Sequence, residues 1–94
     1  LEDLFARIGG EEFALLARGI EGAAASTFAE RLRRGIERLT IPWGNISIPV
    51  TSSFGVATLS EVPPPVDGDA LVSLADRRLY QAKSSGRNRV VGPG

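Results

Sequence analysis

The sequence predicts a single α+β domain with two main helices and a mixed or antiparallel sheet. Two longer stretches, residues 23–39 and 69–83, carry apolar side chains at helical spacing. The rest of the chain alternates short apolar runs with turns rich in glycine, asparagine and proline. The 94 residues, 43% of them hydrophobic and 23% charged, have the length and composition of one small globular domain.

The first predicted element is a β-hairpin. Residues 4–8 and 13–16 are short apolar-rich runs, and the loop GGEE at residues 9–12 separates them. Apolar runs joined by a short loop that contains glycine are typical of hairpins. From the pattern alone, this loop is either ordinary turn chemistry or a place where a ligand approaches the backbone closely, since glycine lacks a Cβ atom.

A helix is predicted over residues 23–39 and a strand over residues 46–59. The helix has an apolar stripe at spacings of four, four and three residues, formed by Phe28, Leu32, Ile36 and Leu39. The strand is entered through a small hairpin around residues 43–45, and its regular part is expected to begin after Pro49. One face of this strand is small throughout and consists of Thr51, Ser53, Gly55 and Ala57.

The second helix is predicted to begin at the N-cap Asp69 and to reach about Lys83. Its apolar side consists of Leu71, Leu74, Ala75, Leu79 and Ala82. Gly86 is suited to the left-handed conformation that ends many helices, and residues 88–91 are predicted to form a short closing strand. The predicted order is therefore strand, strand, helix, strand, helix, strand.

Composition restricts the chemistry that this chain can perform. It has no cysteine and no histidine, so thiolate sites and the commonest general base are excluded. Metal binding must then use oxygen ligands, which favours magnesium, manganese or calcium. A net charge of +0 argues against a nucleic-acid partner held by a basic field, and no apolar run approaches the ~20 residues that span a membrane.

Glu11 is the candidate metal ligand, and the pattern supplies only half of a site around it. Neighbouring side chains on an extended backbone point to opposite faces, so Glu11 and Glu12 are not expected to serve one site equally unless the turn twists them together. The other acidic side chains considered as partners, none of them well placed, are Asp3, Asp67, Asp69 and Asp76.

Two cations bracket the C-terminus of the second helix. Lys83 and Arg87 either stabilise the negative end of the helix dipole or reach toward phosphate groups, Lys83 as a point charge and Arg87 as a planar fork. Arg78 and Arg89 are predicted to be solvated charges.

Four blocks stand out, in order and over essentially the whole chain: RIGGEEF at residues 7–13, AERLR at 29–33, VTSSFGVA at 50–57 and LADRRLYQAKSSGRNRVV at 74–91. Together they resemble the GGDEF family of bacterial diguanylate cyclases. RIGGEEF at residues 7–13 is similar to the signature of that family in its GGEEF variant. VTSSFGVA at residues 50–57 resembles the later strand, and LADRRLYQAKSSGRNRVV at residues 74–91 resembles the closing helix and strand. AERLR at residues 29–33 is similar to the helix between them.

The resemblance implies an enzyme that condenses two GTP molecules into cyclic di-GMP and releases pyrophosphate from each, with Mg2+ or Mn2+ as the cofactor. Two domains would meet as a homodimer, each holding one GTP. The alternative is a module of the same family that binds GTP or cyclic di-GMP for regulation without turnover.

The resemblance also implies roles at the hairpin loop. Gly9 and Gly10 are expected to lie against the nucleotide. Glu11 is expected to bind metal and to help deprotonate the attacking 3′-hydroxyl, and Glu12 is expected to assist with metal.

Further roles fall elsewhere in the chain. Lys83 and Arg87 are expected to contact the triphosphate. Asp3 matches the aspartate of a product-inhibition site for cyclic di-GMP, and Arg31 matches a helix arginine that contributes to that site. The arginine of the same inhibitory motif would fall one residue before Leu1.

The chain is also expected to be incomplete relative to the family. It opens at Leu1 and not at methionine, and residues 1–94 resemble the C-terminal portion of a single GGDEF domain. The implied architecture is a partial nucleotide-cyclase-like, ferredoxin-like fold that lacks the family's first strand, which is central in the sheet and carries an aspartate ligand. We therefore expect the fragment alone to be inactive and its unpaired strand edges to permit strand exchange with a second copy. The implied location is the bacterial cytoplasm, including as the output domain of a membrane-attached sensor.

Overall fold

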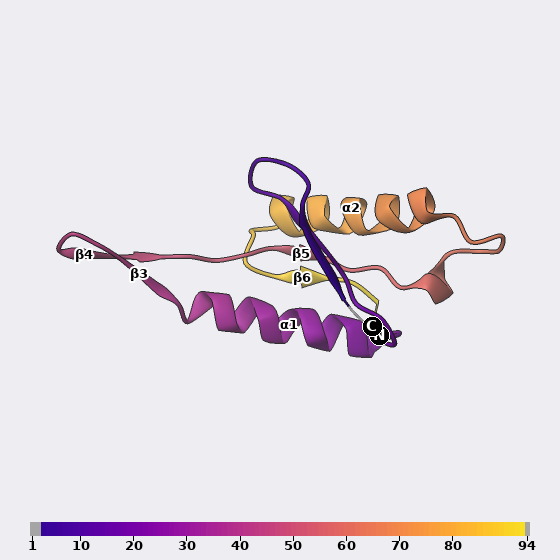
Figure 1. The fold of residues 1–94 in the computed structure, drawn as a ribbon, viewed down its shortest axis with the longest axis horizontal. Coiled ribbons are helices and arrows are strands. Elements are labelled where there is room, and N and C mark those ends of the chain that lie inside the picture. The colour runs from indigo at the N-terminus through magenta and orange to yellow at the C-terminus, as the bar shows by residue number, and fades with distance from the viewer. Residues whose placement is uncertain (1–2, 94) are drawn as a thin grey trace.

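A pair of short strands lies between two helices in the computed structural model, which describes residues 3–93. The strands β5 (Phe54–Gly55) and β6 (Val90–Val91) are parallel. The helix α2 (Gly68–Ser84) packs on both strands, and α1 (Ala23–Glu37) packs on β6 from the opposite side (Figure 1). This layered unit is the only part of the described chain in which helices cover a strand pair.

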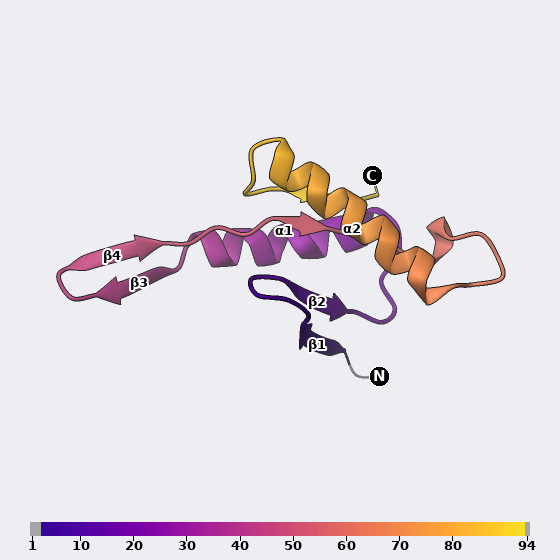
Figure 2. The same ribbon diagram turned by 90° about the horizontal axis from the view of Figure 1, so that it is seen from above.

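Two antiparallel hairpins extend from this unit. The first joins β1 (Leu4–Arg7) to β2 (Phe13–Leu16), with Phe5 opposite Leu15 in the register. The second joins β3 (Thr40–Trp43) to β4 (Ile46–Pro49) and projects well beyond the end of α1 (Figure 2). A short 3-10 turn, η1 (Leu59–Glu61), precedes α2. The molecule is consequently elongated, with extents of 54 × 31 × 25 Å.

The predicted α+β class, the first hairpin and both helices are confirmed, but the single predicted sheet is wrong. The described strands form three separate two-stranded sheets, two of them antiparallel and one parallel. Within residues 3–93 no strand bridges the hairpin β1–β2 to the pair β5–β6, so hydrogen bonding cannot extend from one to the other.

The strand predicted over residues 46–59 is also wrong as one element. The chain forms β4 as far as Pro49, continues without a ladder partner, and forms β5 only where β6 lies beside it. The backbone N–H groups of Phe54 and Val56 donate to Arg89 and Val91, each at 2.9 Å. A strand persists only where a neighbour satisfies its backbone groups, and that neighbour is short here.

The residue that caps the N-terminus of α2 differs from the predicted one. Asp67, and not Asp69, is the N-cap, because the Asp67 carboxylate accepts a hydrogen bond from the backbone N–H of Asp69 at 2.9 Å. Asp69 instead lies in the first turn, where an acidic side chain favours the positive end of the helix dipole. The closing strand begins at Val90 and not at Asn88, because Asn88 has a left-handed backbone with φ of 50°.

Gly55 explains how closely α2 approaches β5. A Cβ atom placed on Gly55 would collide with the backbone carbonyl oxygen of Ala75 and the backbone nitrogen of Leu79. The predicted small face of this strand is therefore the face on which the helix packs. On the helix side of the contact, Ala82 is fully buried.

The core of the described chain is small, and the hairpins leave apolar side chains in solvent. Its buried apolar residues are Ala29, Val62 and Ala82. Phe5 and Phe13 stack with ring centroids 5.5 Å apart, yet they are 69% and 54% exposed. Two of these three buried apolar residues, Ala29 and Ala82, lie on the helices that pack around β5 and β6.

Arg78 is not the solvated charge that the sequence predicts. Its guanidinium donates to both carboxylate oxygens of Glu61, at 2.6 and 2.9 Å, and to the backbone carbonyl of Val56 at 2.7 Å. Glu61 also accepts from the backbone N–H of Thr58 at 2.8 Å. These bonds, that from Arg78 first, lower the pKa of Glu61 to about 2. The pair ties α2 to the turn that follows β5.

This pair predicts a specific acid sensitivity. The pKa of Glu61 falls from an ordinary value of 4.5 in the unfolded chain to about 2 in the folded chain, so its stabilisation is complete above pH 4.5 and is lost as the pH falls toward 2. Replacing Glu61 by glutamine is expected to lower the free energy of unfolding by about 1–2 kcal/mol at pH 7, since the pair is only partly buried. Urea titrations at several pH values should show that the difference in the free energy of unfolding between wild type and Glu61→Gln shrinks as the pH falls from 4.5 toward 2.

The matched control is Asp76→Asn, because Asp76 is exposed and forms no ion pair within residues 3–93. That variant is expected to keep the wild-type urea midpoint. A difference between wild type and Glu61→Gln that stays constant down to pH 2 would contradict the assigned role.

Candidate functional site

The loop between β1 and β2 is closed by its own backbone. The N–H groups of Ile8 and Gly9 donate to the carbonyl oxygen of Glu12 at 3.0 and 3.2 Å, and the N–H of Glu12 donates back to Gly9 at 3.3 Å. A Cβ atom on Gly10 would meet no atom within 4 Å. The space beside the Cα atom of Gly10 is thus open, so a ligand can approach the backbone there.

Arg7 holds the same loop from one side. Its guanidinium donates to the carbonyl oxygen of Gly10 through Nε at 3.1 Å and through Nη2 at 2.6 Å. Sequence reasoning did not assign Arg7 a role, although it begins the RIGGEEF block. Its position three residues before Gly10 was the available signal, because a side chain at that spacing can reach back across a tight turn.

Lys83 lies at this loop although it is distant in sequence. Its ammonium is 3.0 Å from Oε2 of Glu12, a residue 71 positions earlier, and 3.9 Å from Oε1 of Glu11. The turn therefore brings both carboxylates toward one cation, although neighbouring side chains on an extended backbone would diverge. Glu11 is the more accessible of the two, with 79% of its side chain exposed against 40% for Glu12.

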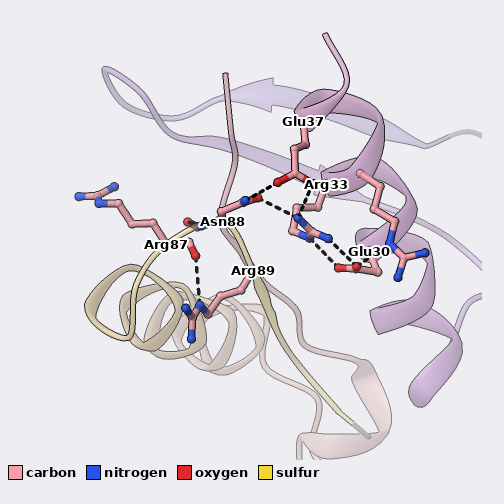
Figure 3. Close-up of polar contacts among 8 residues, drawn as sticks. Glu30, Arg33, Glu37, Arg87, Asn88 and Arg89 are labelled. Atoms are coloured by element: carbon pink, nitrogen blue, oxygen red, sulfur yellow. Dashed lines mark hydrogen bonds and ion pairs between the residues drawn. The ribbon is translucent and has the colours of Figure 1, made fainter. Parts of the chain in front are cut away.

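Arg87 does not join this group. It follows the end of α2, is exposed, and extends away from α1 in Figure 3. Its guanidinium forms no hydrogen bond or ion pair with residues 3–93. The structure thus brings Lys83 to the hairpin loop and leaves Arg87 free in solvent beyond the same helix end.

The two residues predicted for product inhibition are not in contact. The Asp3 carboxylate accepts a hydrogen bond from the backbone N–H of Arg18 at 3.1 Å. Arg31 is exposed on α1 and lines a groove with Ser26, Thr27 and other residues of α1 and β6. No hydrogen bond or ion pair within the described residues joins Asp3 to Arg31.

The carboxylates at the loop suit a hard cation. Among residues 3–93 no three acidic side chains gather into one metal-binding group. Magnesium bound with substrate phosphates needs only one or two carboxylates, because water and phosphate oxygens complete the shell. Glu11 and Glu12, adjacent on one loop and both turned toward Lys83, fit that requirement as one wall of a site.

Neither α1 nor α2 combines the length and the apolar character that a membrane-crossing helix needs.

Comparisons with known proteins agree with the four sequence blocks. The family profile described as "Diguanylate cyclase, GGDEF domain" matches residues 1–89. The chain is 42% identical over 92 residues to the probable diguanylate cyclase DgcT of Escherichia coli (strain K12), covering 96% of this chain and 20% of that protein. It is 45% identical over 91 residues to the diguanylate cyclase VdcA of Vibrio cholerae, covering 90% of this chain and 25% of the relative.

A third relative, the response regulator PleD of Caulobacter vibrioides, is 43% identical over 93 residues, which are 96% of this chain and 20% of PleD. The chain thus spans between 20% and 25% of the length of these relatives. With the profile matching nearly its whole length, the chain belongs to the GGDEF family of diguanylate cyclase domains.

Proposed function

We propose that residues 1–94 are the C-terminal portion of a GGDEF domain with a GGEEF signature, and that this domain condenses two GTP molecules into cyclic di-GMP. The observation that carries the proposal is the meeting of Lys83 with Glu11 and Glu12, at 3.9 and 3.0 Å. A cation beside two carboxylates is what a metal–triphosphate site needs, since phosphoryl transfer depends on positioning and charge neutralisation. The domain has a ferredoxin-like architecture in this proposal, and a central strand outside this chain completes its sheet.

The residues of the loop and the two cations near the end of α2 have different proposed roles. Gly9 and Gly10, which have no Cβ atoms, let the nucleotide approach the backbone closely. Lys83 exchanges its partner Glu12 for triphosphate oxygens, and Arg87, free in solvent, adds a planar fork. Glu11, whose side chain is 79% exposed, accepts the proton of the attacking 3′-hydroxyl.

Glu11 and Glu12 would hold Mg2+ or Mn2+ at this loop. When bound, such an ion neutralises phosphate charge and orients the oxygens of the transferred group. The 3′-hydroxyl oxygen of one GTP attacks the α-phosphorus of the other, and pyrophosphate leaves. Because each domain holds one GTP, the active species is a homodimer.

The proposal also covers product inhibition, pairing with a second copy and the location of the domain. Asp3 and Arg31 bind the product cyclic di-GMP, with Arg31 offering an exposed cation beside its groove. Strand exchange with a second copy would use the open edges of the two hairpins. The domain works in the bacterial cytoplasm, including as the output of a membrane-attached sensor.

The test is to extend the chain upstream with the residues that precede Leu1 in its gene and to incubate it with GTP and Mg2+. Chromatography is expected to show cyclic di-GMP, and Glu11→Gln is expected to lower its formation by about 100-fold or more, because both a metal ligand and a base are lost. Asp76→Asn, an exposed acidic residue on α2, is the matched control and should retain activity.

Two other outcomes discriminate the alternatives. Cyclic di-GMP formed by the 94-residue chain alone would overturn the proposal that this chain is an inactive portion. GTP bound by the extended chain but never consumed would instead favour the regulatory binding module.

A further inference from the structure

The turn that carries Arg87 has an unusual backbone. Gly86, Arg87 and Asn88 follow one another with φ of 128°, 60° and 50°. Glycine adopts positive φ without strain and asparagine tolerates it, whereas an arginine in this region is uncommon. Such a conformation persists only where the surroundings hold it in place.

Part of that support is local. The backbone N–H of Arg87 donates to the carbonyl oxygen of Ala82 at 2.9 Å, which is the long bond of a Schellman ending of α2. The carbonyl oxygen of Arg87 accepts from Nε of Arg89 at 3.1 Å. These contacts fix the backbone on both sides of Arg87 but do not relate it to the rest of the fold.

The remaining support comes from α1 through Asn88 (Figure 3). The Asn88 amide accepts from Nη1 of Arg33 at 2.8 Å and donates to Oε2 of Glu37 at 2.6 Å, across 55 and 51 positions of sequence. The backbone N–H of Asn88 donates to Oγ of Ser53 at 3.0 Å. Two separate segments, α1 and the stretch that leads into β5, thus converge on the residue next to Arg87.

Arg33 is itself held rigidly. Its Nε and Nη2 donate to the two carboxylate oxygens of Glu30, each at 2.7 Å, and only 13% of its side chain is exposed. The bidentate bond lowers the pKa of Glu30 to about 2, so the pair is ionised at neutral pH. With its other side held by Glu30, the guanidinium directs Nη1 at both Asn88, at 2.8 Å, and Glu37, at 3.3 Å.

We propose that Arg33 and Asn88 are positioning residues: they lock the left-handed turn after α2 and thereby direct the Arg87 guanidinium at a bound triphosphate. This inference rests on the proposed role of Arg87. It extends the proposed site to α1 through the bonds that Arg33 and Glu37 form with Asn88. Arg33 and Asn88 do not touch the substrate themselves and act on it only by positioning Arg87.

The test is a double-mutant cycle on the upstream-extended chain used to test activity, with inorganic triphosphate and Mg2+ as the probe and calorimetry as the readout. Arg87→Ala is expected to weaken binding by about 10-fold or more, because it removes charge-assisted bonds to phosphate. Arg33→Lys, which keeps the charge but loses the fork, is expected to weaken it by about 3–10-fold. In the Arg87→Ala background, Arg33→Lys should change affinity by less than about twofold, because the two residues act as one unit.

Asn88→Gly provides an independent arm, since glycine keeps the left-handed backbone while the contacts to α1 are lost. It should weaken binding as Arg33→Lys does and also lose that effect without Arg87. The matched control is Arg34→Ala, because Arg34 also pairs with Glu30, at 2.9 Å, but forms no hydrogen bond to the turn within residues 3–93. That variant should bind like wild type.

The outcomes separate this inference from the function on which it rests. Failure of the extended wild-type chain to bind triphosphate would overturn the proposed role of Arg87 and the positioning role with it. Wild-type binding that Arg33→Lys and Asn88→Gly leave unchanged would overturn the positioning role alone. Equal losses with and without Arg87 would also overturn it, because they would indicate a general structural effect.

Discussion

Replacing Gly55 by leucine is expected to destabilise this chain more than any other single change considered. A side chain at that position must enter the space of the Ala75 carbonyl and the Leu79 nitrogen, which are backbone atoms of α2 and cannot rotate away. The helix would have to move off β5, the strand on which it packs. Because overpacking typically costs 1–3 kcal/mol and here displaces a whole helix, we expect a loss of about 3 kcal/mol or more. Urea unfolding followed by circular dichroism measures it.

The matched control is a second glycine, whose replacement should raise the stability of the chain and not lower it. Gly35 lies within α1, and a Cβ atom there would meet no atom within 4 Å. Gly35→Ala is expected to stabilise the chain by about 0.5–1 kcal/mol, because alanine favours the helix and restricts the unfolded chain. A Gly55→Leu variant with the stability of wild type would show that α2 does not pack on β5 as described.

Replacing Lys83 by methionine is expected to have the largest effect on ligand binding. Methionine keeps much of the length of the side chain but removes the ammonium that lies 3.0 Å from Glu12. Since a hydrogen bond to a charged group contributes about 1.5–3 kcal/mol, affinity for inorganic triphosphate with Mg2+ should fall by about 10–100-fold. Lys83 is the only lysine in the sequence, so its side-chain NMR signal is unambiguous and should shift as triphosphate displaces Glu12.

Arg77→Met is the control for net charge. Arg77 is an exposed cation on the same helix, six positions before Lys83, so its loss changes the charge of α2 equally. It should change triphosphate affinity by less than about twofold, because exposed charges away from a site are screened. Equal effects of the two substitutions would contradict a specific site at Lys83 and indicate general electrostatic attraction.

The candidate site was only partly accessible from the sequence. The resemblance selected Glu11, Lys83 and Arg87, and the structure brings the first two near one another, but the catalytic and binding roles of these residues stay predictions. No role was predicted from the sequence for Arg7 or for the hydrogen-bonded pair Arg33 and Asn88. Asn88 lies inside the GRN segment of the last block, where its position two residues after Gly86 was a signal for a left-handed turn.

The sequence by itself determined the features that depend on near neighbours. Apolar spacing predicted α1 and α2, the GGEE loop predicted the first hairpin, and the small residues around Gly55 marked the face that a helix covers. Helix periodicity and turn preference act over a few residues, so a single chain segment contains the information that specifies them.

Only the tertiary structure decided which distant groups meet. It divided the predicted long strand, because β5 forms only as far as β6 accompanies it. It placed Lys83 at Glu12 and Arg33 at Asn88, across 71 and 55 positions of sequence. It also turned Arg78 from a solvated charge into the partner of Glu61. The physical reason is that a hydrogen bond or ion pair needs two groups within about 3 Å, and for residues far apart in the chain that distance is fixed by how the helices and strands pack.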